Sequence, residues 1–337
     1  MNQNSNSGNK PISELRFNLG SKDWVLIATG RGKRPDTFAK QQRIKDSTPE
    51  SECLFCNLET QEKPVLEYKD ENGQWLLAVI PNKYPAFTRS DGLHERAEGP
   101  YSLMDGVGFH EVVISRDHHK SLAEMPKEQA CRVIDAYQER YLHLAKEKFI
   151  NYISIFHNHG REAGASMGHP HSQIIAIPLI DPDLLRSLNG SRIFFENQSE
   201  CVHCKMIEWD IEDHQRVVFE NKEFIALAPF ASRVSFEIRI YPKEHHAYFE
   251  RISDSEKVFL TEMLQTVLHK IFVGLNDPPY NFFVHTAPCD GKDYSHYHWY
   301  IDVLPKTDTW AGFELGAGIE ISTIEPEKAA EYLRNIE

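Results

Sequence analysis

The chain has 337 residues, a formal net charge of −13, 41% hydrophobic residues and 26% charged residues. This length accommodates two domains of ordinary size, each with its own core. The negative charge argues against nucleic acid as a partner, because duplex binding depends on lysine and arginine side chains that neutralise phosphates. No apolar run approaches the roughly 18 residues of a membrane span, so we expect a soluble protein with no membrane partner.

Residues 1–10 are polar and lack the apolar segment of a signal peptide. We therefore expect a cytoplasmic location, where the reducing environment disfavours disulfides. Four of the six cysteines lie in two Cys-x-x-Cys pairs. In such a compartment these pairs indicate metal or redox sites.

Strand-like and helical patterns alternate along the first half of the chain. Apolar runs at 23–28, 74–80 and 111–115 predict strands, and residues 126–144 carry apolar side chains at helical spacing after Pro126. The basic turn 30–35 gathers positive charge, which suits either a small anion or a solvated loop.

The second half repeats this order. Runs at 224–229 and 237–241 predict strands, and Ser253-x-x-Glu256 resembles a capping box before a long helical pattern. Each half ends in a predicted strand that carries His-x-His, at 169–175 and at 296–301. Each half therefore reads as an α+β unit of antiparallel strands with one main helix.

The division between the halves follows from composition. Residues 180–199 are rich in Asp, Pro, Asn and Ser, which is typical of a linker. We expect one domain over 11–180, a linker over 181–199 and a second domain over 200–337.

Each Cys-x-x-Cys pair is followed by a His-His pair and then by the His-x-His. His118 and His169 are 51 residues apart, and so are His245 and His296. Structural zinc takes four Cys or His ligands in a tetrahedron, often with two thiolates from one Cys-x-x-Cys turn. The sequence therefore predicts two zinc ions per chain, held by Cys53, Cys56, His118 and His169 and by Cys201, Cys204, His245 and His296.

Other ligand choices remain open at these sites. His119, His246 or His203 would also serve as the histidine ligand. Free thiols among scattered surface histidines are the alternative to a metal site. A redox dithiol is disfavoured because no thioredoxin-like pattern surrounds either pair.

His169 and His171 lie on one face of their predicted strand. If zinc holds His169, then His171 is a fixed imidazole beside it, and a neutral imidazole is a competent nucleophile toward phosphorus. The preceding run Gly164-Ala-Ser-Met-Gly168 is small enough for backbone amides and Ser166 to approach an anion. The arrangement suits phosphoryl or nucleotidyl transfer.

The run from Gly164 to Gln173, GASMGHPHSQ, closely resembles the active-site signature of the galactose-1-phosphate uridylyltransferases. This family is a branch of the histidine triad superfamily in which Gln replaces the third His. The resemblance extends to RGKRP at 31–35, to Cys53-x-x-Cys56, to PNKYP at 81–85, to Asp117-His118 and to GFE at 312–314. It implies two tandem histidine-triad-like domains, each an antiparallel sheet with a main helix, and a homodimer.

The resemblance also implies a ping-pong reaction on a nucleotide sugar and a hexose 1-phosphate. His171 would attack the α-phosphorus of UDP-glucose, glucose 1-phosphate would leave, and galactose 1-phosphate would take the uridylyl group. Gln173 would hydrogen-bond the phosphoryl oxygens of the covalent intermediate. The other implied substrate contacts are Arg31, Arg34, Asn82, Asn158, Gly164, Ser166 and Glu314.

Some members of the family hold a second metal at positions that match His285, His296 and His298, with an acidic residue. Cys201 and Cys204 favour instead a Cys/His zinc site that includes His296. The second His-x-His is followed by Trp299-Tyr300 in place of Ser-Gln, and no Gly-Ala-Ser run precedes it. We therefore expect one catalytic site per chain.

Two departures leave the substrates open. The well-known bacterial members of the family have extra residues between the glycine-rich run and His-Pro-His, and this chain lacks them. In addition, no Thr-Gln pair follows Glu314. The glycine-rich run 312–320 also resembles a plant-type relative that uses ADP-glucose and phosphate, so an ADP-glucose phosphorylase is the alternative. A non-catalytic nucleotide-binding protein is a third hypothesis, against which the intact His171 and Gln173 argue.

Overall fold

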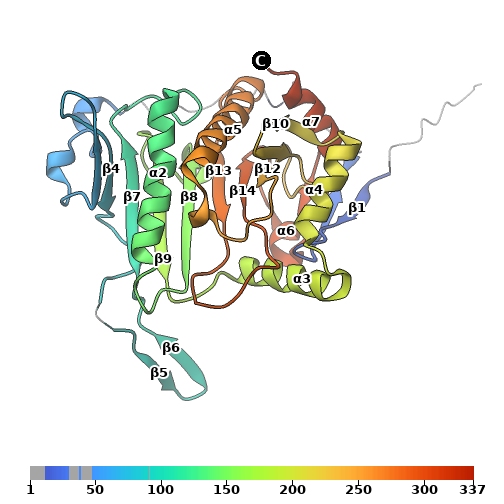
Figure 1. The fold of residues 1–337 in the computed structure, drawn as a ribbon, viewed down its shortest axis with the longest axis horizontal. Coiled ribbons are helices and arrows are strands. Elements are labelled where there is room, and N and C mark those ends of the chain that lie inside the picture. Colours follow the sequence, from blue (N-terminus) through green and yellow to red (C-terminus); the bar gives the residue numbers. More distant parts are fainter. Residues whose placement is uncertain (1–11, 30–37, 39–47, 91) are drawn as a thin grey trace, which may run out of the picture.

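The structure is a computed structural model that describes residues 12–29, 38, 48–90 and 92–337. A single antiparallel sheet runs through both halves of the chain in the order β10-β11-β12-β14-β13-β8-β9-β7-β4-β3 (Figure 1). Its first-half strands are β3 (Leu66–Lys69), β4 (Trp75–Pro81), β7 (Phe109–Ser115), β8 (Tyr152–His159) and β9 (His171–Ile177). Its second-half strands are β10 (Val217–Glu220), β11 (Phe224–Leu227), β12 (Ile238–Pro242), β13 (Tyr280–His285) and β14 (Tyr300–Pro305).

The two halves meet where β8 pairs with β13. The pairing is antiparallel and runs from Tyr280 opposite His159 to Val284 opposite Ile155. Because backbone hydrogen bonds continue across this junction, side chains of one half lie beside side chains of the other on each face of the sheet.

Two long helices cover one face of the sheet. Helix α2 (Lys127–Leu144) follows Pro126, and α5 (Asp254–Gly274) begins with the predicted capping box of Ser253 and Glu256. The helices lie side by side in Figure 1, and the largest buried cluster joins them to strands of both halves. The predicted α+β class with antiparallel strands and one main helix per half is confirmed.

The opposite face is covered differently in the two halves. Helices α3 (Pro182–Gln198) and α4 (Val202–Asp213) pack there on Tyr241 and Tyr300 of the second half. In the first half, residues around the short helices η2 (Glu50–Glu52) and η3 (Leu58–Thr60) pack on β4 and β7. The first-half part of this face carries the side chains of His171 and Gln173, because alternate residues of a strand point the same way.

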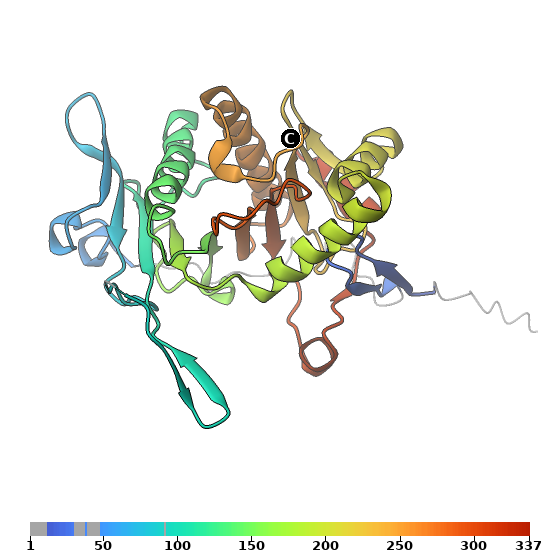
Figure 2. The same cartoon turned by 60° about the horizontal axis from the view of Figure 1, so that its bottom comes forward.

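Smaller elements surround the main sheet. Strands β1 (Glu14–Phe17), β2 (Trp24–Ile27) and β15 (Ile321–Ser322) form a three-stranded sheet, and η4 (Arg161–Ala163) and η5 (Phe249–Arg251) are single turns. Helices α6 (Gly312–Ala317) and α7 (Pro326–Arg334) lie near the C-terminus. The hairpin of β5 (Glu95–Glu98) and β6 (Tyr101–Met104) projects from the body (Figure 2). No helix in the described ranges has the length and apolar character needed to cross a bilayer.

Two local expectations differ from the structure. Residues 181–199, predicted as a linker from composition, form helix α3: Asp181 accepts a hydrogen bond from the Asp183 N–H, and Pro182 is the first helical residue. Asp and Pro are loop residues, but they are also preferred at helix starts. The predicted strand at 296–301 begins only at Tyr300, so both histidines of the second His-x-His precede it.

Candidate active site and metal centres

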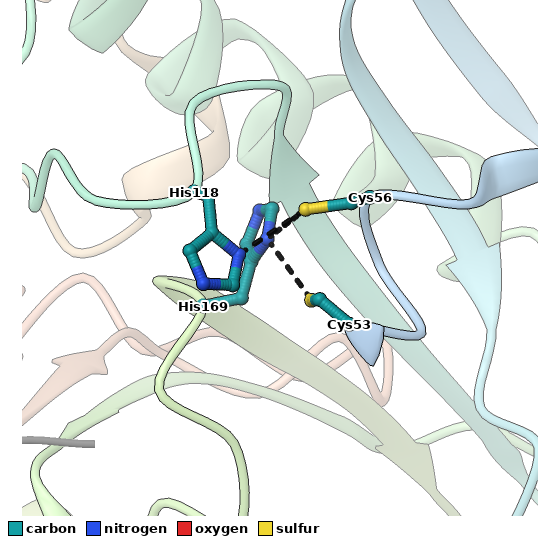
Figure 3. Close-up of side chains that lie close together, drawn as sticks. All are labelled: Cys53, Cys56, His118 and His169. Carbon is teal, nitrogen blue, oxygen red and sulfur yellow. Dashed lines mark hydrogen bonds between the residues drawn. The ribbon is translucent and has the colours of Figure 1, made fainter. Parts of the chain in front are cut away.

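The four residues predicted for the first zinc site come together between the Cys-x-x-Cys turn, the end of β7 and the start of β9 (Figure 3). Cys56 Sγ lies 3.1 Å from His118 Nδ1, and both Cys53 Sγ and Cys56 Sγ lie 3.5 Å from His169 Nδ1. Tetrahedral zinc with Zn–S near 2.3 Å and Zn–N near 2.0 Å separates sulfur from nitrogen by about 3.5 Å. The donor atoms and their spacing fit a zinc ion.

Backbone carbonyls fix the orientation of both histidine rings. His118 Nε2 lies 3.0 Å from the Thr48 carbonyl, and His169 Nε2 lies 2.7 Å from the Ser115 carbonyl. A carbonyl only accepts, so each neutral ring carries its proton on Nε2 and presents the Nδ1 lone pair to the thiols. A zinc-bound histidine usually donates its other ring N–H to a carbonyl or carboxylate in this way.

Burial shifts the pKa values of His169 and Cys56. It lowers the pKa of His169 to about 4, which keeps the ring neutral at neutral pH. Burial, together with the neighbouring Cys53 thiol, raises the pKa of Cys56 to about 12. Without a metal, Cys56 therefore stays a protonated thiol at neutral pH, and a bound cation would favour its thiolate form.

A second group of the same composition lies in the other half. Cys201 precedes α4, and Cys204 Sγ lies 3.3 Å from His245 Nδ1 and 3.5 Å from His298 Nδ1. The rings of His245 and His298 are 5.2 Å apart at 87°, and those of His118 and His169 are 5.2 Å apart at 85°. The second group therefore repeats the geometry of the first.

The prediction of His296 as the fourth ligand is wrong, since the structure places His298 there. In both halves the ligand precedes the first residue of a strand by two positions, His171 of β9 or Tyr300 of β14. The His298 Nε2 donates to the Pro242 carbonyl at 3.0 Å, as His169 does to Ser115. The equal spacing in sequence did not reflect the strand register.

The other histidines considered as ligands lie elsewhere. His119 and His246 are in neither group. His203 is buried against the rings of Tyr241, Tyr297 and Tyr300. His285 stacks on Tyr300, with ring centroids 4.7 Å apart.

His171 is the first residue of β9 and only 7% exposed. Its Nδ1 lies 2.8 Å from the His169 carbonyl, so the neutral ring is protonated on Nδ1 and has its lone pair on Nε2. Burial lowers the pKa of His171 and favours this neutral form. Phe55, inside the Cys-x-x-Cys turn, contacts the ring edge to face at 5.1 Å. A fixed imidazole with an unprotonated Nε2 can attack an electrophilic phosphorus.

Gln173 lies two residues along β9 on the same face and is in contact with His110. Its Oε1 is 2.7 Å from His110 Nε2, and the Asn82 amide nitrogen is 3.0 Å from the same ring atom. Asn82 Oδ1 accepts the backbone N–H of Tyr84. No motif marks His110; the alternation of β7 is the sequence signal for it, because it puts residue 110 on the same face as residue 112, which lies opposite Gln173.

Asn158, near the end of β8, is paired with Asn281 of β13. Asn281 Nδ2 donates to Asn158 Oδ1 at 2.8 Å and to the Ala163 carbonyl at 2.7 Å. Gly164 follows with a positive φ of 89°, a conformation that suits glycine, and Ser166 is exposed on the same loop. Asn281 was not foreseen, because only the sheet register brings the second half beside this loop.

Three predicted substrate contacts remain, and the structure describes only one of them. Arg31 and Arg34 lie outside the described residues. Glu314 lies in α6, where its Oε2 accepts the N–H of Ala311, and none of its contacts within the described part of the chain involves His171. A cavity of about 300 Å³ opens beside the loop between β8 and β9, with Asn158 and Gly168 in its lining.

The chain is similar in sequence to named proteins over nearly its whole length. Residues 5–180 match the family model described as galactose-1-phosphate uridyl transferase, N-terminal domain. The chain is 33% identical over 332 residues to ADP-glucose phosphorylase of Arabidopsis thaliana, covering 96% of this chain and 93% of the relative. It is 31% identical over 339 residues to galactose-1-phosphate uridylyltransferase of Thermotoga maritima, covering 97% and 99%.

Solved structures with a similar fold cover nearly the whole chain. An ADP-glucose phosphorylase from Arabidopsis thaliana with bound ADP-glucose superposes with a TM-score of 0.82 at 31% identity, covering 97% of this chain and 99% of the other. A uridylyltransferase structure superposes with a TM-score of 0.74 at 25% identity, covering 96% and 97%. The predicted histidine-triad-like fold is thereby confirmed.

Proposed function

The chain belongs to the galactose-1-phosphate uridyl transferase family and is a nucleotidyltransferase, and from this we propose that it transfers the nucleotidyl group of a nucleotide sugar through His171. The observation that carries the proposal is the hydrogen bond from His171 Nδ1 to the His169 carbonyl, which leaves Nε2 without a proton. No separate base is needed, because the attacking nitrogen holds no proton.

In the first step the Nε2 of His171 bonds to the α-phosphorus of the nucleotide sugar. The bond from that phosphorus to the bridging oxygen breaks, and the electron pair leaves with the sugar 1-phosphate. The positive charge on the nucleotidylated ring is stabilised by the His169 carbonyl at Nδ1. In the second step a phosphate oxygen of the acceptor attacks the same phosphorus, and the His171 ring is released.

Neutral amides face the transferred group. Asn158, His171 and Gln173 share one face of β8 and β9, since Phe156 pairs with Gln173 and His157 with Ser172. Amide N–H groups can donate to phosphoryl oxygens where negative charge gathers in the transition state. We assign Gln173 and Asn158 this role, with Ser166 and Gly164 on the adjoining loop.

Zinc has a structural role in this proposal. Cys53, Cys56, His118 and His169 would hold one ion, and Cys201, Cys204, His245 and His298 a second. When bound, zinc supplies charge and geometry that fix the surrounding turns. The first site contains His169, whose carbonyl sets the proton position of His171.

The leading reaction is the exchange of UDP-glucose and galactose 1-phosphate for glucose 1-phosphate and UDP-galactose. It is supported by the family model and by the Thermotoga maritima relative. The second candidate is phosphorolysis of ADP-glucose, supported by the 33% identical Arabidopsis thaliana relative and by the similar structure with bound ADP-glucose. The two share His171 and differ in the base and in the acceptor.

Intact-mass measurement separates them. The purified protein is incubated with UDP-glucose or with ADP-glucose, without acceptor, beside a His171→Ala control. A UMP adduct that galactose 1-phosphate removes supports the uridylyltransferase, and an AMP adduct that phosphate removes supports the phosphorylase. Binding of both sugars without any adduct would refute covalent transfer and favour the non-catalytic nucleotide-binding protein.

We also propose a homodimer in a reducing, cytoplasmic compartment. All six cysteines are free thiols, four of them in the metal groups. Sedimentation of the zinc-loaded protein tests the assembly.

A further inference from the structure

Two side chains outside the predicted set, His110 and Asn281, each contact one of the amides beside His171. An asparagine or glutamine amide has an acceptor end and a donor end, and only the donor end can bond a phosphoryl oxygen. The orientation of each amide therefore decides whether it stabilises or repels the transferred group. In both cases the orientation of the amide follows from a backbone group that can act only as a donor or only as an acceptor.

The first chain of hydrogen bonds begins at the backbone N–H of Ala86, which can only donate. It lies 3.1 Å from His110 Nδ1, so this nitrogen is the acceptor and the neutral ring carries its proton on Nε2. Burial lowers the pKa of His110, which favours the neutral ring. Of the two groups near Nε2, only Gln173 Oε1, at 2.7 Å, can accept that proton, because the nearby Asn82 atom is a donor.

The Gln173 amide is thereby oriented. Its oxygen is taken by His110, and its Nε2 has no hydrogen-bond partner within the ranges that the structure describes. The two N–H bonds of that nitrogen are left for an incoming oxygen.

The second chain begins at the backbone carbonyl of Ala163, which can only accept. It takes a hydrogen bond from Asn281 at 2.7 Å, so the atom of Asn281 that faces the site is its amide nitrogen. The same nitrogen lies 2.8 Å from Asn158, which must present its oxygen. The Nδ2 of Asn158 is then left toward the loop of Gly164, where an added Cβ would lie 3.8 Å from it.

We propose that His110 and Asn281 are positioning residues that turn the amides of Gln173 and Asn158 so that both present N–H groups to the transferred phosphoryl. This inference rests on the proposed function. It also assigns a role to the second half of the chain, because Asn281 belongs to β13 and reaches Asn158 across the strand junction.

Double-mutant cycles test the proposal. The rate of nucleotidyl-enzyme formation in a single turnover is measured with whichever nucleotide sugar labels the wild type. His110→Leu and Asn281→Leu are each expected to slow it by about tenfold or more with little change in nucleotide-sugar affinity, since the charge develops only in the transition state. His110→Gln, which keeps a side-chain donor, is expected to recover most of the rate.

The decisive comparison is between two kinds of double mutant. In one kind both substituted residues belong to the same hydrogen-bond network, and in the other kind each belongs to a different network. In the Gln173→Ala background His110→Leu should slow the reaction by less than about threefold, and likewise Asn281→Leu in the Asn158→Ala background. In the double mutants that combine the two networks, the rate reductions of the single variants should multiply. These double mutants are His110→Leu with Asn158→Ala and Asn281→Leu with Gln173→Ala. If the two substitutions within one hydrogen-bond network slowed the reaction by the product of their single effects, the proposal would be overturned.

One readout does not depend on activity. A ¹H–¹⁵N spectrum of the histidine rings should show His110 neutral and protonated on Nε2, with a shift of that resonance in Gln173→Ala. Protonation on Nδ1 would overturn the His110 part even in a protein that accepts no nucleotidyl group. A wild-type protein that forms no nucleotidyl adduct but gives the expected His110 spectrum would refute the proposed function. It would leave the proposed amide orientation intact.

Discussion

Tyr300 begins β14 two residues after the metal-site residue His298, as His171 begins β9 two residues after His169. Tyr300 therefore stands in the second half where His171 stands in the first. By the same register Asp302 stands at the position of Gln173. Asp302 is fully buried and paired with Arg233 at 2.6 Å, so at these two positions the second half has a tyrosine and a buried carboxylate in place of the imidazole and the neutral amide.

A histidine at position 300 should not create a second reactive site. Tyr300→His restores an imidazole, but Asp302, whose carboxylate is paired with Arg233, has no N–H to donate to a phosphoryl oxygen, and no Gly-Ala-Ser loop precedes it. Intact mass should show one nucleotidyl group per chain in this variant and none in Tyr300→His combined with His171→Ala. Two groups per chain would contradict the argument.

Zinc content should distinguish His298 from His296. His298→Ala removes a ligand and is expected to lower bound zinc from two ions per chain toward one, whereas His296→Ala should keep two. Plasma emission spectrometry on dialysed protein measures the metal. Loss of zinc in His296→Ala but not in His298→Ala would restore the assignment made from spacing.

Removing one partner of the buried Glu111–Arg140 pair should destabilise the first half. Arg140 donates to both oxygens of Glu111 at 2.7 and 2.8 Å, and the side chains are 7% and 1% exposed. Arg140→Met leaves an unpaired buried carboxylate, with an expected loss of about 3–5 kcal/mol in the free energy of unfolding. Urea unfolding of the zinc-loaded protein measures this loss, and Glu111→Leu in the same chain should recover much of it.

Gly190 should not tolerate a side chain. A Cβ at this position of α3 would lie 1.9 Å from the carbonyl oxygen of Gly20, so Gly190→Ala must push the N-terminal segment away from the helix. We expect a loss of roughly 1–3 kcal/mol or more by thermal unfolding. Asn189→Ala, on the exposed side of the same turn, is the matched control and should be close to neutral. Equal stability of both variants would argue against the close contact.

The sequence by itself determined the features that depend on short segments. Alternation and helical spacing predicted the strands and the two main helices, and the capping box at Ser253 marked the start of α5. The Cys-x-x-Cys turn with His118 and His169 predicted the first metal group, since ligand chemistry requires those residue types. The GASMGHPHSQ run indicated His171 and Gln173 as candidates for nucleotidyl transfer.

The tertiary structure decided what depends on strand register and on backbone partners. It selected His298 over His296, because the ligand must stand two residues before a strand whose start the pattern did not reveal. It made residues 182–198 a helix, and it joined both halves in one sheet, which brings Asn281 to Asn158. His110 and Asn281 carry no motif: alternation in β7 indicates only the face on which His110 lies, and the contacts of both residues arise from pairing between strands far apart in the chain.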